Sequence, residues 1–382
     1  MTRKKLPIGI QTFREIREDN CYYVDKTAFA LRMIQEGKAY FLSRPRRFGK
    51  SLFLDTLAEL FAGNEPLFRG LYCHDKWDWN KKYPVIRISF AEGVMESRAG
   101  LDARILDILA ENAQRLGVEE DDGEIPGRFI RLIQRAEAKF GQRAVILVDE
   151  YDKPILDNLT APDLARRMRD GLRNLYSVIK GQNAHIKFAM LTGVSKFSKV
   201  NIFSGLNNLS DITLDAEYSS ICGYTDADVD TLFAPELEGL DREKIRHWYN
   251  GHKWEGEAVY NPFDLLLLFQ KRVFRPFWFE TGTPTFLVDM LAEQQVFLPK
   301  LENLETSAAL LSSFDVENIS PIALLFQTGY LTIESSQQYG AQIRYRLRFP
   351  NQEVRSSFGE AMLLRLRPKL GVRSADLDGV WP

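Results

Sequence analysis

The stretch Tyr40–Leu52 constrains the fold of this chain more than any other. It places a short apolar strand before a basic loop, and the tripeptide Gly49-Lys50-Ser51 then opens an amphipathic helix. This layout predicts a phosphate-binding loop (P-loop), in which backbone N–H groups and the helix N-terminus point at phosphates. Lys50 is expected to reach the β- and γ-phosphates of a nucleotide, and the Ser51 hydroxyl is expected to sit on Mg²⁺.

One position departs from the usual pattern. G-x-x-x-x-G-K-[ST] begins with glycine, and Arg44 occupies that place here. Because Gly-Lys-Ser is a common tripeptide, the alternative is a helix N-terminus that follows a solvated basic loop. On the nucleotide hypothesis, the contacts from this stretch are Arg44, Pro45, Arg46, Arg47, Phe48, Gly49, Lys50, Ser51 and Leu52.

Composition limits the class of protein. The chain has 382 residues, which is enough for two or three domains, and its formal net charge is −2. A nucleic-acid contact would therefore have to come from a local patch. Three scattered cysteines fit a reducing cytoplasm, and no apolar run has the length of a membrane span. The histidines and cysteines show no metal-ligand spacing.

Strands alternate with helices through the first half of the chain. Apolar strands are expected at 39–42, 85–90, 144–148 and 185–191, with amphipathic helices between them. This order predicts an α/β domain with a parallel sheet over residues 1–215. Ligands of such sheets bind at the carboxyl ends of the strands.

A second motif ends the buried strand at 144–148. Asp149 follows five consecutive apolar residues, and Glu150 comes next. Walker B chemistry needs a carboxylate at such a strand tip to reach Mg²⁺, and a second acid to orient and deprotonate the attacking water. Asp149 fits the first role and Glu150 the second, although core strands also often end in polar residues.

The tip of the next strand carries further candidates. Thr192 and Ser195 are predicted as polar sensors of the γ-phosphate, and Lys196 and Lys199 follow closely. The alternative is an ordinary turn at the end of a strand.

The second half of the chain changes in character after about residue 215. A helical lid or coupling region is expected at 216–320, a winged-helix-like unit at 321–366 and a tail at 367–382. Asn261-Pro262 and Thr283-Pro284 each predict a helix start. One face of the last predicted strand bears Arg344, Arg346 and Arg348, which either meet a phosphate backbone or form the soluble face of an amphipathic strand.

The P-loop stretch resembles that of bacterial and archaeal AAA-ATPase-like proteins, which often carry a C-terminal nuclease-superfamily domain of the PD-(D/E)XK type. The resemblance extends from about residue 5 to about residue 358. The other matching stretches are 24–27, 147–154, 192–198, 203–209, 248–251, 260–263 and 281–284.

The resemblance implies a P-loop fold of the additional-strand type, with ATP and Mg²⁺ as ligands. It also implies that Arg44 is normal at the first P-loop position, and that Lys50, Ser51, Asp149 and Glu150 have the roles given above. The chain ends about thirty residues after the segment matching 349–354. We therefore expect the nuclease domain to be absent.

These observations predict a cytoplasmic ATPase whose hydrolysis is coupled to motion of the C-terminal half. The alternative is a nucleotide-gated module with negligible hydrolysis that binds a protein or nucleic acid through that half. No membrane association is expected, and a homo-oligomer is left open. Arg46 and Arg47 are the local cations best placed to help bind phosphate, and neither is assigned as an arginine finger.

Overall fold

The computed structural model describes residues 3–196, 208–282, 287, 291, 301–311 and 320–370. Several sequence predictions fall outside these ranges: Lys199, most of the 203–209 motif, the helix start at Thr283-Pro284, and the tail after residue 370.

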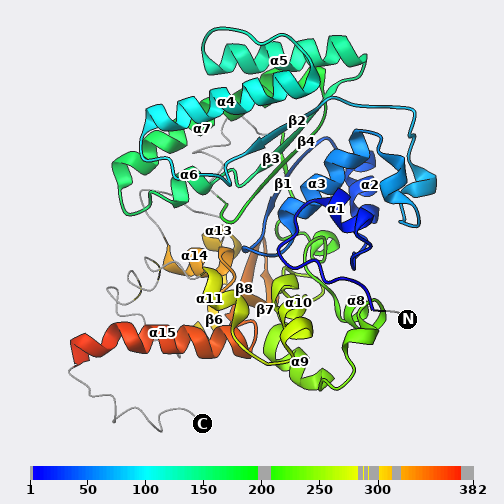
Figure 1. The fold of residues 1–382 in the computed structure, drawn as a ribbon. Coiled ribbons are helices and arrows are strands. Elements are labelled where there is room, and N and C mark those ends of the chain that lie inside the picture. The colour runs from blue at the N-terminus through cyan, green and yellow to red at the C-terminus, as the bar shows by residue number, and fades with distance from the viewer. Residues whose placement is uncertain are drawn as a thin grey trace.

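A five-stranded parallel sheet forms the centre of the first half (Figure 1). Its strands are β1 (Ala39–Ser43), β2 (Val85–Ser89), β3 (Ala144–Asp149), β4 (Ile186–Gly193) and β5 (Ser210–Asp211). Their spatial order is β2-β3-β4-β1-β5, and every neighbouring pair is parallel. β4 therefore lies between the P-loop strand β1 and the carboxylate strand β3. This insertion confirms the predicted P-loop fold of the additional-strand type.

Helices cover both faces of the sheet, which is why β1 is buried along its whole length and β3 up to its last residue. α4, α5 and α7 lie on one face, and α1, α2 and α3 lie on the other (Figure 1). The helices of this half are α1 (Phe13–Glu18), α2 (Thr27–Glu36), α3 (Lys50–Phe61), α4 (Arg98–Leu116), α5 (Ile125–Phe140), α6 (Lys153–Leu156) and α7 (Pro162–Gly181). Short 3-10 turns occur at Glu65–Phe68, His74–Lys76 and Asn183–His185.

Local signals explain where the longer helices begin and end. α4 begins at Arg98 because the Ser97 hydroxyl accepts a hydrogen bond from the Gly100 N–H. It ends at Gly117, whose left-handed backbone (φ 63°) suits glycine. The predicted helices and strands of this half are all present, with ends displaced by one or two residues.

The second half is mostly helical, as predicted. Its helices are α8 (Asp226–Thr231), α9 (Arg242–Tyr249), α10 (Pro262–Lys271), α11 (Phe277–Gly282), α13 (Ala308–Leu311), α14 (Pro321–Gln327) and α15 (Gln352–Leu370), with 3-10 turns at Ala216–Tyr218 and Ala234–Glu236. Asn261 caps α10 by accepting a hydrogen bond from the Phe263 N–H, so the predicted helix start there is confirmed.

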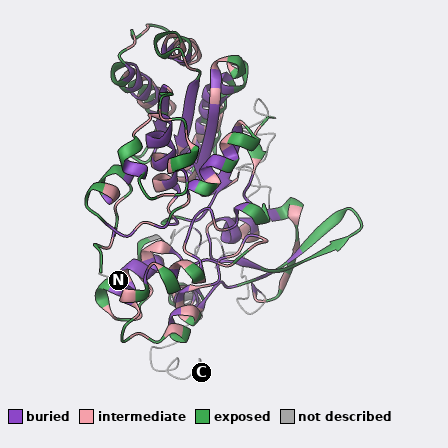
Figure 2. Cartoon of the chain, turned by 90° about the vertical axis from the view of Figure 1, so that its right-hand side faces the viewer, coloured by how far each residue is buried: buried purple, intermediate pink, exposed green. Residues whose placement is uncertain are grey.

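A small antiparallel sheet follows the pattern of a winged helix. α14 precedes the hairpin of β7 (Thr332–Tyr339) and β8 (Gln342–Arg348), and β6 (Leu304–Ser307) pairs with the other edge of β8. The far part of the hairpin extends from the body and is exposed (Figure 2). Since β6 comes from before residue 321, this sheet crosses the predicted boundary between the helical and winged-helix units. The domain division stays a prediction.

The two halves share their apolar packing. One cluster of buried side chains runs from the sheet to Trp254, Trp278 and Tyr330 in the later half. A second cluster joins Tyr22 and Val24 near the start of the chain to the helices α8–α10. Within the described ranges, no helix has the length and apolar character that a membrane crossing needs.

Candidate functional site at the P-loop

The loop between β1 and α3 has the backbone of an anion cradle. Arg47 (φ 66°) and Gly49 (φ 91°) are left-handed, and α3 begins at Lys50 directly after them. Such alternation turns successive N–H groups toward one concave side. A Cβ placed on Gly49 would meet nothing within 4 Å, so the space beside this residue is open.

Lys50 is held inside this loop. Its Nζ donates to the carbonyl oxygens of Arg44 and Pro45, at 2.9 Å each, and only 7% of the residue is exposed. Burial lowers the pKa of Lys50, and the carboxylates of Asp149 and Glu150 oppose that shift. An ammonium has three donors and these contacts use two, so one N–H is left for an anion. This observation fits a phosphate ligand.

Arg44 points away from the cradle. Its guanidinium is fully buried and donates to the backbone carbonyls of Ser43, Thr213 and Tyr218 at 2.9–3.1 Å. It also lies 4.1 Å from the ring centre of Trp254. Burial lowers the pKa of Arg44 to about 10. The side chain that replaces the first P-loop glycine therefore joins the loop to the segment after β5, and the structure does not bring it to the phosphate side.

The carboxylates after β3 are arranged by their neighbours. Asp149 accepts hydrogen bonds from the Thr192 hydroxyl (2.8 Å) and from the Glu150 N–H (3.0 Å). Glu150 has φ 49°, an uncommon value for a residue with a side chain. Burial, and next the charge of Asp149, raise the pKa of Glu150, while Lys50 opposes the shift. Thr192 thus orients Asp149 rather than facing the cavity.

Ser195 belongs to a different network. Asp152 is buried and accepts hydrogen bonds from the hydroxyl and the N–H of Ser195, both at 2.6 Å, and from the Val194 N–H. A Cβ on Gly193 would lie 2.4 Å from Asp152, so only glycine fits there. The predicted sensor Ser195 therefore has its hydroxyl engaged by Asp152, and its role as a γ-phosphate contact stays an untested prediction.

A cavity of about 540 Å³ opens over the loop. The predicted residues that line it are Arg46, Arg47, Phe48, Gly49, Lys50, Ser51, Leu52 and Glu150. The predicted residues that do not line it are Arg44, Pro45, Asp149 and Ser195. The structure thus brings the phosphate-binding loop and the carboxylate of Glu150 to one space, although they are about a hundred residues apart in the sequence.

A narrower apolar recess adjoins this cavity. The two share Pro7, Phe48, Gly49, Leu52, Tyr224 and Pro262, and the recess continues past Tyr22, Val24 and Cys222. Of the stretches that carry the family resemblance, 24–27 contributes Val24 and Lys26 to this recess. The contributions of Tyr224 and Pro262 depend on how the later half packs, and no local pattern indicates them.

Residues of the later half also contact the phosphate-binding loop. The Phe48 ring meets His252 and Trp254 edge-to-face, at 4.8 and 5.6 Å between ring centres. Burial lowers the pKa of His252 to about 3, so this imidazole is neutral. Trp278 donates from its indole N–H to the Arg46 carbonyl. The contacts of His252, Trp254 and Trp278 with the loop were not predicted from the sequence.

Two buried carboxyl groups support Trp278. Its backbone N–H donates to both Asp264 (2.8 Å) and Glu353 (3.0 Å). Burial raises the pKa of Glu353 to about 7, and burial together with the charge of Glu353 raises the pKa of Asp264. Both carboxyl groups therefore hold a proton more tightly than an exposed carboxyl group does. Among the described residues, no group of three or more His, Cys, Asp and Glu side chains could hold a metal ion.

Residues 7–203, just over half of the chain, match the AAA-ATPase-like family, described as "Predicted AAA-ATPase". The chain is also 65% identical over 370 residues to the "Uncharacterized protein in vnfD 5'region" of Azotobacter chroococcum mcd 1. That alignment covers 97% of this chain and 72% of the other protein. A solved structure of Drosophila ORC bound to AT-rich DNA and Cdc6 aligns over 91% of both chains, with 12% identity and a TM-score of 0.24. A similarity this low supports no inference about fold or ligand.

Proposed function

This chain belongs to the family of AAA-ATPase-like proteins, and we propose that it binds ATP with Mg²⁺ at the P-loop and hydrolyses it. One observation carries the proposal. The buried ammonium of Lys50, held by loop carbonyls, shares a cavity of about 540 Å³ with Ser51 and Glu150. A cavity of this size suits a nucleotide.

The triphosphate lies along the loop. Backbone N–H groups between Arg46 and Ser51 and the start of α3 bind its oxygens, and Lys50 contacts the β- and γ-phosphates. Arg46 and Arg47 line the cavity and add positive charge at its rim. Arg47 also lies 5.0 Å from the ring centre of Phe263, which holds its guanidinium against the later half.

Mg²⁺, when bound, neutralises charge that develops on the phosphate oxygens. The Ser51 hydroxyl is the proposed protein ligand from the cavity lining, and the Asp149 carboxylate, which does not line the cavity, would reach the ion through water. The hydrogen bond from Thr192 orients Asp149 for this role.

Glu150 acts as the general base. It accepts a proton from a water molecule whose oxygen bonds to the γ-phosphorus, and the bond from that phosphorus to the bridging oxygen breaks to release ADP. Partial burial raises the pKa of Glu150, which makes its carboxylate a better proton acceptor.

The adenine base enters the apolar recess beside Gly49. The side chains there are Tyr22, Val24, Phe48 and Tyr224, which offer an apolar surface to a planar ring. The recess includes residues from both halves of the chain. Closure of the region 216–360 over the base would therefore accompany binding.

The alternative is a nucleotide-gated module with negligible hydrolysis, whose C-terminal half binds a protein or nucleic acid. The exposed face of β8 with Arg344 and Arg346 favours a polyanionic partner, although Glu305 pairs with Arg346 at 3.6 Å. Nucleic-acid binding that weakens with salt, and that is lost when Arg344, Arg346 and Arg348 are changed together, supports this partner. The three buried free cysteines fit the cytoplasm as the compartment.

Phosphate release from Mg-ATP by the purified protein tests the proposal, with Lys50→Ala and Glu150→Gln alongside. We expect turnover to be lost in both variants, because one loses the phosphate contact and the other loses the base. Nucleotide binding is expected to survive in Glu150→Gln only. Tight binding without turnover in the wild-type protein would favour the nucleotide-gated module, and absence of both would contradict the proposal.

A further inference from the structure

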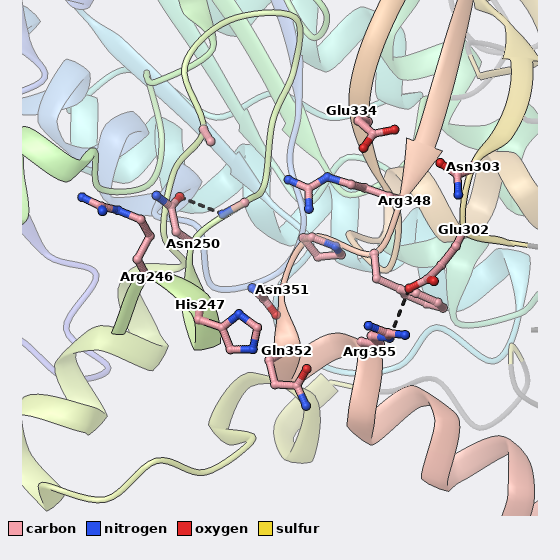
Figure 3. Close-up of a pocket in the computed structure, with 14 residues that line it drawn as sticks. Arg246, His247, Asn250, Glu302, Asn303, Glu334, Arg348, Asn351, Gln352 and Arg355 are labelled. Atoms are coloured by element: carbon pink, nitrogen blue, oxygen red, sulfur yellow. Dashed lines mark hydrogen bonds and ion pairs between the residues drawn. The ribbon is translucent and has the colours of Figure 1, made fainter. Parts of the chain in front are cut away.

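A second cavity, of about 490 Å³, lies in the C-terminal half (Figure 3). It shares no lining residue with the P-loop cavity. Its walls come from the end of α9, the turn after it, the edges of the small sheet and the start of α15. It is therefore a separate site, and nothing in the proposed ATPase chemistry uses it.

Arg348 supplies an uncommitted positive charge to this cavity. It is the last residue of β8 and is exposed. In the part of the chain that the structure describes, its guanidinium has no hydrogen bond or ion pair. Figure 3 shows it directed toward the middle of the cavity. Its five donors are therefore available to a ligand.

The other charges around the cavity are largely balanced. Arg355 pairs with Glu302 at 3.1 Å, and Arg246 pairs with Asp226 and Glu243, which lie outside the lining. Glu334 is the second acidic lining residue. Of the charged lining side chains, Arg348 and Glu334 are therefore the two without an ion pair among the described residues, and their formal charges balance each other.

Asn351 leaves a buried donor unsatisfied beside Arg348. Only 8% of the residue is exposed, and its side-chain oxygen accepts a hydrogen bond from the Val354 N–H at 3.0 Å. Its amide nitrogen has no partner among the described residues. A buried amide donor without a partner is costly, and a ligand that supplies an acceptor would remove that cost.

The start of α15 is a further feature of this cavity, although the buried carboxyl group of Glu353 lies in its first turn. Asn351, Gln352 and Arg355 all line the cavity, so the first turn of this 19-residue helix borders it. A helix N-terminus favours anions.

We propose that this cavity binds the phosphate group of a phosphorylated ligand, through Arg348, Asn351 and the first turn of α15. Arginine and backbone N–H groups together are the usual partners of phosphate oxygens, and the volume accommodates a ligand of nucleotide size. A phosphorylated small molecule and the phosphorylated end of a nucleic-acid strand present the same group. The cavity therefore indicates that the ligand carries a phosphate group, and the experiment distinguishes the two kinds of molecule that could carry it.

Calorimetric titration of the full chain with ribose 5-phosphate tests the proposal, with ribose as the unphosphorylated control. We expect saturable binding of ribose 5-phosphate only. Affinity should fall by about tenfold or more in Arg348→Gln, which removes one charged contact. It should fall likewise in Asn351→Asp, which retains the cap on α15 but replaces the free donor with a carboxylate.

Arg344→Gln is the matched control, because Arg344 lies on the same face of β8 but outside the cavity. It should bind ribose 5-phosphate as the wild-type protein does. Lys50→Met, which keeps the buried stem of the P-loop lysine, should also leave this binding unchanged. Thermal melts of each variant show whether it folds.

Hexathymidylate with and without a 5′-phosphate distinguishes the two sources. If the 5′-phosphorylated hexamer binds more tightly than ribose 5-phosphate and the unphosphorylated hexamer does not bind, the site is assigned to strand ends. If ribose 5-phosphate binds more tightly than the phosphorylated hexamer, the site is assigned to small molecules. The proposal is overturned if neither phosphorylated probe binds saturably. It is also overturned if Arg348→Gln and Arg344→Gln behave alike, or if Lys50→Met abolishes the binding.

Discussion

The indole Nε1 of Trp278 donates a hydrogen bond of 3.1 Å to the backbone carbonyl of Arg46, a residue 232 positions earlier in the chain. Arg46 belongs to the phosphate-binding loop, and Trp278 belongs to α11 in the later half. The later half therefore contacts the loop backbone directly. If nucleotide binding and motion of the C-terminal half are coupled, as the proposed function requires, this bond is a direct route for the coupling.

Trp278→Phe tests that route, because phenylalanine keeps an aromatic ring and removes the N–H. The Arg46 carbonyl would lose its partner, which costs about 1 kcal/mol of unfolding free energy. We expect the dissociation constant for ATP to rise by roughly two- to tenfold as the loop relaxes. Denaturant unfolding and nucleotide titration measure the two effects.

Trp248→Phe is the matched control, because this half-buried tryptophan contacts Tyr249 and Phe274 through its ring, away from the loop. It should leave ATP affinity unchanged. Equal affinities in the two variants would contradict the coupling.

Restoring the usual glycine with Arg44→Gly should harm the protein. The change removes three hydrogen bonds to backbone carbonyls and the contact with Trp254. We expect a loss of about 3 kcal/mol in unfolding free energy, with no gain in nucleotide affinity.

Arg46→Ala should affect nucleotide affinity rather than stability, because Arg46 is exposed and lines the P-loop cavity. Its melting temperature should stay near that of the wild type, while ATP binds more weakly. Thermal unfolding and nucleotide titration of both variants separate the roles of these neighbouring arginines. A stable Arg44→Gly protein would show that the buried guanidinium contributes little.

Much of the fold could be predicted from the sequence because its signals are local. The apolar run before Asp149, the Gly-Lys-Ser helix start and the helix start at Asn261-Pro262 each act within a few residues. The alternation of strands and helices then leaves few topologies, and the additional-strand order follows from the resemblance.

The rest of the site depends on contacts between distant segments. Whether Arg44 faces a phosphate or the protein interior depends on Thr213, Tyr218 and Trp254, and no spacing near residue 44 indicates them. Ser195 follows the end of a strand, as a sensor would, but its hydroxyl donates a hydrogen bond to Asp152. A residue type at a strand end shows that a polar group is present, and its direction is determined by the tertiary structure.

The carboxyl pair of Asp264 and Glu353 should make stability depend on pH. Burial raises the pKa of Glu353 to about 7 from an ordinary value of 4.5, and it also raises that of Asp264. A raised carboxyl pKa means that the folded state binds the proton more tightly than the unfolded state does. The associated stability is present below about pH 4.5 and is lost as pH rises through about 7.

Asp264→Asn keeps an acceptor for the Trp278 N–H and removes one charge. We therefore expect it to reduce the slope of unfolding free energy between about pH 5 and 8, where the wild-type protein should lose on the order of 2 kcal/mol. Denaturant unfolding at several pH values measures this slope. Glu360→Gln, at an exposed position of α15, the helix that contains Glu353, should retain the wild-type slope. A wild-type slope in Asp264→Asn would mean that the raised pKa values of this pair do not set the pH dependence of stability.

Adding a single methyl group at Gly251, which lines the second cavity, should destabilise the folded protein strongly. It lines that cavity with φ 126°, and a Cβ there would lie 1.9 Å from the carbonyl oxygen of Pro350. Because both the backbone conformation and the close approach of Pro350 exclude a side chain, Gly251→Ala should lower the unfolding free energy by about 3 kcal/mol or more.

Gly239→Ala separates the two causes. Gly239 is also left-handed (φ 77°), but its Cβ would meet nothing within 4 Å, so only the backbone cost of about 1 kcal/mol applies. Chemical denaturation of both variants measures the difference. Equal losses would mean that the backbone beside Asn351 moves aside easily, and the cavity walls would then be less rigid than the contact between Gly251 and Pro350 indicates.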